Sequence, residues 1–295
     1  MGKMLRRMGC FLLVSLVATL LCLHSSSSAK VHSGTWGTNT KWYYDTKTKT
    51  VVIDCEGRMD DNSSDHGPTI GWGKFYMKAK KVIFKSGITY IGTFTFDNFQ
   101  KLEKVVLPEG LVSIGAYAFE GTINLKKVKF PTTMRTIGRD AFDGSGIEAL
   151  SLSSIEKIGS SALSGTNIKR LKIPLHCQNI ESYAFSSCFK LQHVKIENGI
   201  KTISTSMFSR TGIETITIPA SVTKIGTRAL FAFSPEESKL KRVTINSTKI
   251  KKWGKNIFGN ARKDLVIRVP KSKKKEYTKA LREGGLPEYV KIVGK

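Results

Sequence analysis

The hexapeptide Ile114-Gly115-Ala116-Tyr117-Ala118-Phe119 decides the fold, because related hexapeptides return along the whole chain. The other copies begin at residues 91, 137, 158, 180, 203, 225 and 253. Six of the seven intervals between successive copies are 21 to 23 residues long, and the last is longer. Such a period is typical of a solenoid, in which one unit cannot bury its apolar face until neighbouring units stack against it.

A short segment of alternating apolar and polar residues precedes each hexapeptide. Side chains alternate between the two faces of a strand, so the apolar members of each segment are expected to point into the core. Proline often follows and ends the strand, because it cannot donate to a ladder. The Ala-Phe step of the hexapeptide fits a tight helical turn. The sequence therefore predicts an α/β repeat solenoid that is rich in parallel strands and has short helical turns. The apolar pairs are Val105/Leu107, Val128/Phe130, Leu150/Leu152, Leu171/Ile173, Val194/Ile196, Ile216/Ile218 and Val243/Ile245.

The first 29 residues have the layout of a secretory signal peptide. Lys3, Arg6 and Arg7 precede an apolar run at 11–23, and small residues follow it up to Ala29. The run is short for a membrane span. We therefore predict export with cleavage, and an uncleaved membrane anchor is the alternative.

Different sequence flanks the repeats, which we place at 82–269 in about eight units of 21 to 28 residues. Residues 30–81 contain two β-prone runs and are predicted to form an aromatic β-hairpin cap, since an open solenoid end must be covered. Its tryptophans, Trp36, Trp42 and Trp72, are expected to pack against that end; a carbohydrate platform is the alternative. Residues 270–295 are predicted to be a basic C-terminal cap with a helix over 272–283.

The chain carries 48 Lys and Arg against 23 Asp and Glu, a formal net charge of +25. The excess is concentrated at the C-terminal end, where residues 239–295 hold 18 cations and 4 acids. A positive field of this kind attracts polyanions such as teichoic acid, anionic glycans or extracellular DNA. The alternative is a basic surface that serves solubility alone.

Cysteine use argues against a disulfide framework. Only Cys55, Cys177 and Cys188 follow the predicted leader, whereas exported disulfide-rich proteins carry an even and dense set. Cys177 occupies a position that other units fill with an apolar residue, and a free cysteine behaves as a small buried hydrophobe. We expect it to fill the core, with a bridge to Cys188 or Cys55 as the alternative.

No catalytic constellation is evident. The chain has no G-x-S-x-G elbow, phosphate-binding loop or dinucleotide fingerprint. Its histidines are scattered, and the one local grouping, His66 with Asp60, Asp61 and Asp65, lies in a polar loop. The sequence therefore predicts no enzyme, no cofactor, no metal and no small-molecule substrate.

A row of cations on the outward face of the repeat strands is the candidate binding site. Strand alternation sends Lys129, Lys172 and Lys195 to the same face of successive units. Solenoids bind partners over extended faces of this kind, although charged side chains also simply keep an exposed sheet solvated. The candidate partner-binding residues are Lys127, Lys129, Arg170, Lys172, Lys195 and Arg242.

With these features the chain resembles the BspA-like leucine-rich repeat proteins, bacterial and protist surface proteins whose unit reads LxxVxIPxxVxxIGxxAFxxC. Residues 191–230 nearly spell this unit, and the likeness covers about 82–269. Glu181 and Ser204 replace the glycine after Ile, and only Cys188 stands at the family's cysteine position. The resemblance implies a right-handed β-α superhelix of the leucine-rich-repeat type, export, and a role in adhesion or protein binding. A protein or extracellular-matrix partner is therefore expected, with electrostatic binding of an anionic polymer as the alternative; the oligomeric state is left open.

Overall fold

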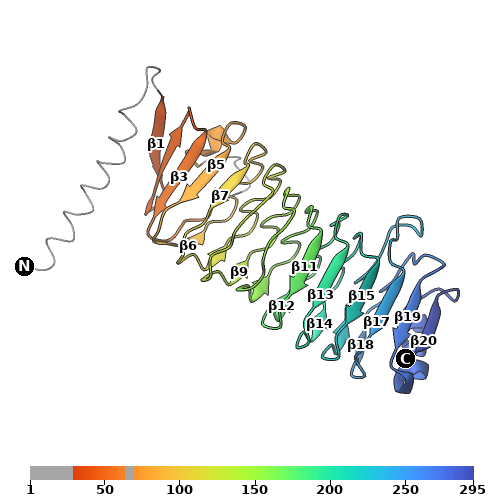
Figure 1. Ribbon diagram of the computed structural model, residues 1–295. Coiled ribbons are helices and arrows are strands. Elements are labelled where there is room, and N and C mark those ends of the chain that lie inside the picture. Colours follow the sequence, from red (N-terminus) through yellow and green to blue (C-terminus); the bar gives the residue numbers. More distant parts are fainter. Residues whose placement is uncertain (1–28, 64–69) are drawn as a thin grey trace, which may run out of the picture.

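Repeated coils stack into an elongated column in the computed structural model, which describes residues 29–63 and 70–295 (Figure 1). Each coil of the repeat region contributes short strands that pair in parallel with the coils before and after it. The solenoid predicted from the 21-to-23-residue period is therefore confirmed. The predicted signal peptide at 1–29 lies outside the described residues except for its last position.

Three ladders of backbone hydrogen bonds run along the column, and the first contains the longest strands. Here β3 is followed by a strand or a bridge in every later coil, with Lys127 and Ala149 forming the isolated bridge. The members of this first ladder are β3 (Thr50–Cys55), β5 (Lys81–Phe84), β7 (Lys104–Val106), β11 (Arg170–Ile173), β13 (His193–Ile196), β15 (Thr215–Ile218), β17 (Arg242–Ile245), β19 (Val266–Val269) and β20 (Lys291–Gly294).

The second ladder contains strands of two residues in most coils, and from β6 onward each strand ends on the first residue of the repeated hexapeptide. It is interrupted once, between β12 and β14. Its members are β4 (Gly57–Arg58), β6 (Ile88–Ile91), β8 (Ser113–Ile114), β9 (Thr136–Ile137), β10 (Lys157–Ile158), β12 (Asn179–Ile180), β14 (Thr202–Ile203), β16 (Lys224–Ile225) and β18 (Lys252–Trp253).

The third ladder replaces the short helical turns that the sequence suggested. In the coil of Phe119, the Tyr117, Phe119 and Gly121 N–H groups donate to carbonyls of the next coil at 2.8–2.9 Å. Tyr117 has φ of 57° and Gly121 of 64°, so the backbone enters the left-handed region twice within this turn and does not continue as a helix. Within the described residues, helix occurs only in η2 (Gly73–Phe75), η3 (Lys271–Lys273) and α2 (Lys274–Glu283). The protein is thus a strand-rich solenoid with little helix, and the β-α superhelix detail is not confirmed.

Glycine after the leading Ile lets adjacent coils approach closely. A Cβ on Gly138 would lie 2.6 Å from the Gly115 carbonyl carbon, and one on Gly226 would lie 2.4 Å from Thr205 N. No side chain fits there without moving the backbone. Glu181 and Ser204 fill this position in two coils, and the second ladder is interrupted between those same coils.

One continuous hydrophobic cluster fills the column from end to end. Every apolar pair predicted from strand alternation belongs to it or packs against it. The hexapeptide aromatics stack on one another: the ring centroids of Phe96 and Phe119 are 5.6 Å apart, and those of Phe119 and Phe142 are 5.3 Å apart, with nearly parallel planes. Burying such rings is the main stabilisation available to a coil.

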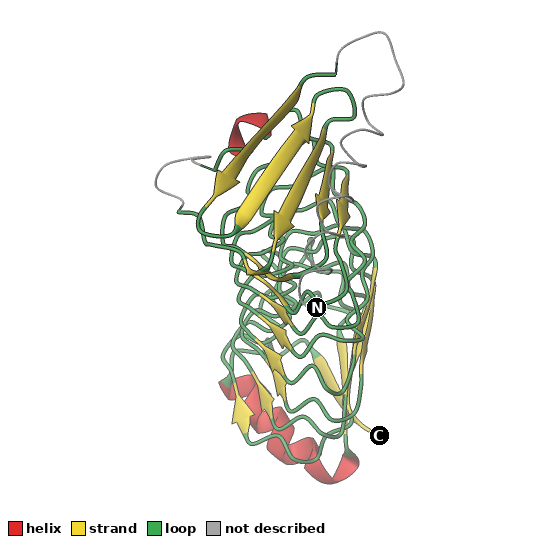
Figure 2. Cartoon of the chain, turned by 90° about the vertical axis from the view of Figure 1, so that its left-hand side faces the viewer, coloured by secondary structure: helices red, strands yellow, loops and turns green. Residues whose placement is uncertain are grey.

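Both ends of the column are closed by distinct elements (Figure 2). At the N-terminal end, β1 (Val31–Trp36), β2 (Thr40–Asp45) and β3 form an antiparallel meander. Trp42 and Trp72 are buried there, and Trp72 Nε1 donates to Thr95 O at 3.0 Å, so neither ring offers an open platform for a sugar. At the C-terminal end, α2 buries Tyr277 and Leu281, and β20 continues the first ladder.

Candidate functional site

The outward face of the first ladder brings some of the predicted cations together. β11 and β13 pair so that Arg170 faces His193 and Lys172 faces Lys195. Neighbouring strands are about 4.8 Å apart, so these four side chains form one compact group. All four are exposed.

The remaining candidates lie apart from this group. Lys127 pairs with Ala149, whose coil separates Lys127 and Lys129 from β11. Arg242 faces Thr215 in β15, a strand without cations between β13 and Arg242. The six predicted residues therefore share one side of the column but do not form a continuous row.

Acidic neighbours reduce the positive potential of the β11–β13 group. Lys172 Nζ donates to Glu197 Oε1 at 2.7 Å. The pKa of Glu197 is held below its ordinary value, chiefly by the hydrogen bond from Lys172 and then by that from Leu175 N. Arg170 and Lys195 form no ion pair in the described part of the chain. A partner could therefore contact these two cations without breaking an existing ion pair.

Cations without acidic partners are most numerous at the C-terminal end. Five of the 18 between residues 239 and 295 form ion pairs with described acids, namely Lys241, Arg262, Lys273, Lys279 and Arg282. The other thirteen have no ion pair within residues 29–63 and 70–295. This end is suited to attract an anionic polymer, because unpaired exposed charges contribute most to the long-range field.

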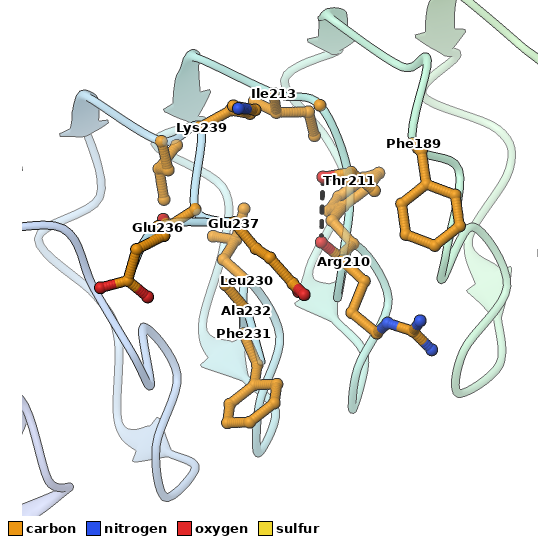
Figure 3. A pocket seen from close by; sticks show the side chains of 14 residues that line it. Phe189, Arg210, Thr211, Ile213, Leu230, Phe231, Ala232, Glu236, Glu237 and Lys239 are labelled. Atoms are coloured by element: carbon orange, nitrogen blue, oxygen red, sulfur yellow. Dashed lines mark hydrogen bonds between the residues drawn. The ribbon is translucent and has the colours of Figure 1, made fainter. Parts of the chain in front are cut away.

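A groove of about 510 Å³ interrupts the regular surface where residues 234–239 are inserted (Figure 3). Its floor consists of buried apolar side chains, and its sides are formed by Phe189, Arg210, Phe231 and the insertion. The sequence did not indicate a groove at this position. Two features of the sequence could have indicated the groove. One is the single long interval between hexapeptides, and the other is Phe189, which lies in a connecting segment that is one residue longer than the same segment in the two neighbouring coils.

Three carboxyl groups line up along the third ladder, one per coil. Asp97, Glu120 and Asp143 each follow the hexapeptide's last residue. Burial, followed by the charges of Asp97, Asp143 and Asp140, raises the pKa of Glu120 to about 7. The pKa values of Asp97 and Asp143 are also raised, mainly by burial.

Replacing Glu120 by Gln should stabilise the protein at alkaline pH and have no effect in acid. The folded pKa of about 7 exceeds the ordinary 4.5, so the fold favours the protonated acid. Its stabilising contribution is present below pH 4.5 and is lost as pH rises through 7. The shift alone corresponds to about 3 kcal/mol, which solvent screening of a partly exposed group reduces to about 1 kcal/mol. Thermal unfolding of both proteins at pH 8 and pH 4 checks this, and an equal difference at both pH values would contradict it.

The described cysteines serve the core. Cys55, Cys177 and Cys188 are free and buried, so the prediction of a core role for Cys177 is confirmed. Burial raises the pKa of Cys177 to about 12 and that of Cys188 to about 11. Thiols with such pKa values carry little thiolate and react slowly.

Residues 29–63 and 70–295 contain no group of three or more His, Cys, Asp or Glu that could hold a metal ion. Asp65 and His66 of the predicted polar loop lie outside them, whereas Asp60 and Asp61 lie within them. None of the described helices is both long and apolar enough to cross a membrane.

The stacked coils and exposed ladder faces define a repeat protein of the leucine-rich class. The family profile for the BspA-type leucine-rich repeat region matches in six copies, over residues 68–176, 112–236 and 156–283. The chain therefore belongs to the BspA-type leucine-rich repeat family, as its sequence resemblance indicated. Proteins of this family are typically non-enzymatic. Membership of the family suggests a protein-binding or surface role.

Solved structures agree with this fold. A leucine-rich repeat protein from Eubacterium ventriosum ATCC 27560 is 19% identical with a TM-score of 0.59, over 82% of this chain and 67% of that chain. One from Bacteroides ovatus ATCC 8483 is 22% identical with a TM-score of 0.53, over 79% and 70%. A leucine rich cell surface protein from Faecalibacterium prausnitzii A2-165 is 17% identical with a TM-score of 0.43, over 83% and 77%. The first two likenesses support the fold alone. A search of curated proteins found no significant match.

Proposed function

We propose that this protein is exported and acts at the cell surface as a non-enzymatic module that binds a protein or extracellular-matrix partner. Family membership and the signal-peptide pattern at 1–29 support the location. We also retain, as part of this proposal, the division into an N-terminal cap at 30–81, repeats at 82–269 and a basic cap at 270–295, and the right-handed coil of the column.

One observation carries the proposed binding surface: the register that places Arg170 beside His193 and Lys172 beside Lys195. A parallel sheet face that is exposed over successive coils is the kind of extended surface that repeat proteins offer to large partners. Cations aligned on it would contribute specificity and association rate through complementary charge on the partner.

Reversing the charge of Arg170, Lys172 and Lys195 to Glu should weaken partner binding by about tenfold or more. The three side chains are exposed, so thermal stability should change little. The matched control replaces Lys201, Lys224 and Lys252 by Glu; these cations are also exposed but lie in or beside the second ladder. Affinity for a cross-linked and identified partner is then measured for both variants. Equal weakening by both triple variants would contradict a specific site on the first ladder.

The second candidate function is electrostatic binding of an anionic polymer by the C-terminal end, favoured by its thirteen cations without ion pairs. Such binding should fall steeply as salt rises from low to physiological concentration. Lipoteichoic acid and double-stranded DNA serve as probes. Capture of these polymers alone, with loss at physiological salt, would favour this function over protein binding.

A further inference from the structure

We propose that the groove beside the inserted loop is a second recognition site, which binds a peptide segment of a partner protein that carries an aromatic or aliphatic side chain next to Asp or Glu. This proposal rests on the proposed protein-binding function but concerns other residues. The groove's volume of about 510 Å³ lies within the range of ligand-binding pockets. It is large enough for a few residues of an extended chain.

The floor of the groove selects an apolar side chain. Phe208, Ile213, Leu230 and Leu240 line it and are buried in the column. A sugar would need polar side chains on the floor as well to satisfy its hydroxyl groups, and the charged residues of this groove, Arg210 and those of the insertion, lie on its sides. An apolar peptide side chain can enter the groove without losing hydrogen bonds to water, because it makes none.

Exposed aromatic rings beside the groove are the second observation. Phe189 is 62% exposed and Phe233 is 55% exposed. Aromatic rings left in solvent next to a cavity are typical of binding surfaces, since they bury a large area at a small loss of conformational entropy. Gly212 packs against the Phe189 backbone, where an added Cβ would lie 2.4 Å from Phe189 O, so the corner that presents the ring is held firmly.

Arg210 supplies the preference for a carboxylate. Its guanidinium carbon lies 4.0 Å from the Phe233 ring centroid and 5.3 Å from that of Phe189. Its Nε is buried without a hydrogen-bond partner, and it forms no ion pair with any described acid. A guanidinium held between rings keeps its donor edge free and pairs well with a carboxylate.

The acids of the insertion do not neutralise this arginine. Figure 3 shows Glu236 on the opposite side of the groove from Phe189 and Arg210, with the carboxylate of Glu237 between them. Neither acid forms an ion pair with Arg210. A bound peptide would therefore place its acidic residue toward Arg210. The net charge of +25 also favours acidic over basic segments.

The test measures fluorescence anisotropy of blocked, fluorescein-labelled pentapeptides with the full chain. One probe contains Phe followed by two Asp; in the second Ala replaces Phe, and in the third Lys replaces both Asp. The proposal expects the first probe to bind about tenfold more tightly than either of the others. The Ala probe controls for general attraction of acids to a basic surface. Equal affinity for all three probes, or no binding of the first, would overturn the proposal.

Variants locate the site. Arg210→Asn keeps the left-handed conformation, because Asn98 and Asn260 adopt it at equivalent positions, and Phe189→Ala with Phe233→Ala removes the rings. Each variant should bind the first probe about tenfold more weakly. The control Ile123→Ala, at a corresponding corner and 55% exposed, should not. Unchanged binding by Arg210→Asn would overturn the role of the arginine.

Two further outcomes would also count against the proposal. Displacement of the probe by trigalacturonic acid at equal concentration would indicate an anionic-sugar site. Sedimentation of the full chain as a dimer that Phe189→Ala dissociates would indicate a second copy as occupant. The Arg170, Lys172 and Lys195 triple variant should retain probe binding, so loss of this site and loss of the proposed first-ladder function are separable.

Discussion

Replacing Phe119 by Ala is expected to lower the free energy of unfolding by about 3 to 5 kcal/mol. Phe119 is fully buried and stacks between Phe96 and Phe142, with Phe84 edge-on at 6.4 Å. Neighbouring backbone cannot collapse into the vacated space, because hydrogen bonds of the third ladder fix the coil on both sides. The loss thus includes both the transfer of the ring and the remaining cavity.

Urea unfolding followed by circular dichroism measures this loss. Ile123→Ala is the control, because Ile123 lies four residues further along the same coil with its side chain 55% exposed. Its effect should stay within about 0.5 kcal/mol. A Phe119→Ala protein that is no less stable than the control would show that the aromatic stack does not support the column.

Replacing Gly138 by Ala should lower the free energy of unfolding by about 1 to 3 kcal/mol, although it adds only a methyl group. The added Cβ would lie 2.6 Å from Gly115 C and 2.8 Å from both Gly115 O and Ala116 N. These are backbone atoms and cannot rotate away as a flexible side chain could. The two coils must separate locally, which weakens the second ladder between β8 and β9.

The control for this prediction is Ser204→Ala, at the same register in a coil that already accommodates a side chain. Ser204 Oγ donates to Ile180 O, so this variant should lose about 1 kcal/mol, the value of one hydrogen bond. Hydrogen exchange of the Gly138 N–H, which donates to Ile114 O at 2.9 Å, reports the separation directly. Unchanged exchange in Gly138→Ala would contradict the packing argument.

The sequence was sufficient to predict the solenoid because two patterns agree. The 21-to-23-residue repeat and the alternation of apolar and polar residues within each strand place apolar side chains at the same positions of successive units. Leu171 and Ile173 are apolar at a spacing of two, and both are buried in β11. The turn after the leading Ile was mispredicted as helical, because residues such as Tyr117 and Arg228 have no local preference for the positive φ they adopt. Hydrogen bonds to adjacent coils impose that conformation, and no property of a single unit indicates it.

The candidate site was only partly predictable for a similar reason. Alternation along one strand indicates that Lys172 and Lys195 face outward, and both are exposed in the structure. It does not indicate that Glu197 pairs with Lys172. Phe189, Arg210 and Phe233 belong to three different coils, and the contacts of Arg210 with the two rings therefore depend on the register in which the coils stack.

Interruptions in the ladders are offset from one another along the column. The second ladder is interrupted between β12 and β14, where β11 and β13 pair fully in the first. The first is interrupted between β13 and β15, where β14 pairs with β16 in the second. The third ladder spans both places, through Phe185 N to Met207 O and Phe208 N to Ala229 O. At each of these two junctions, two of the three ladders therefore still join the adjacent coils. If the column is pulled along its axis, as in a protein tethered at one end, neither junction is a place where all backbone hydrogen bonds between coils are missing, and the remaining ladders carry the force.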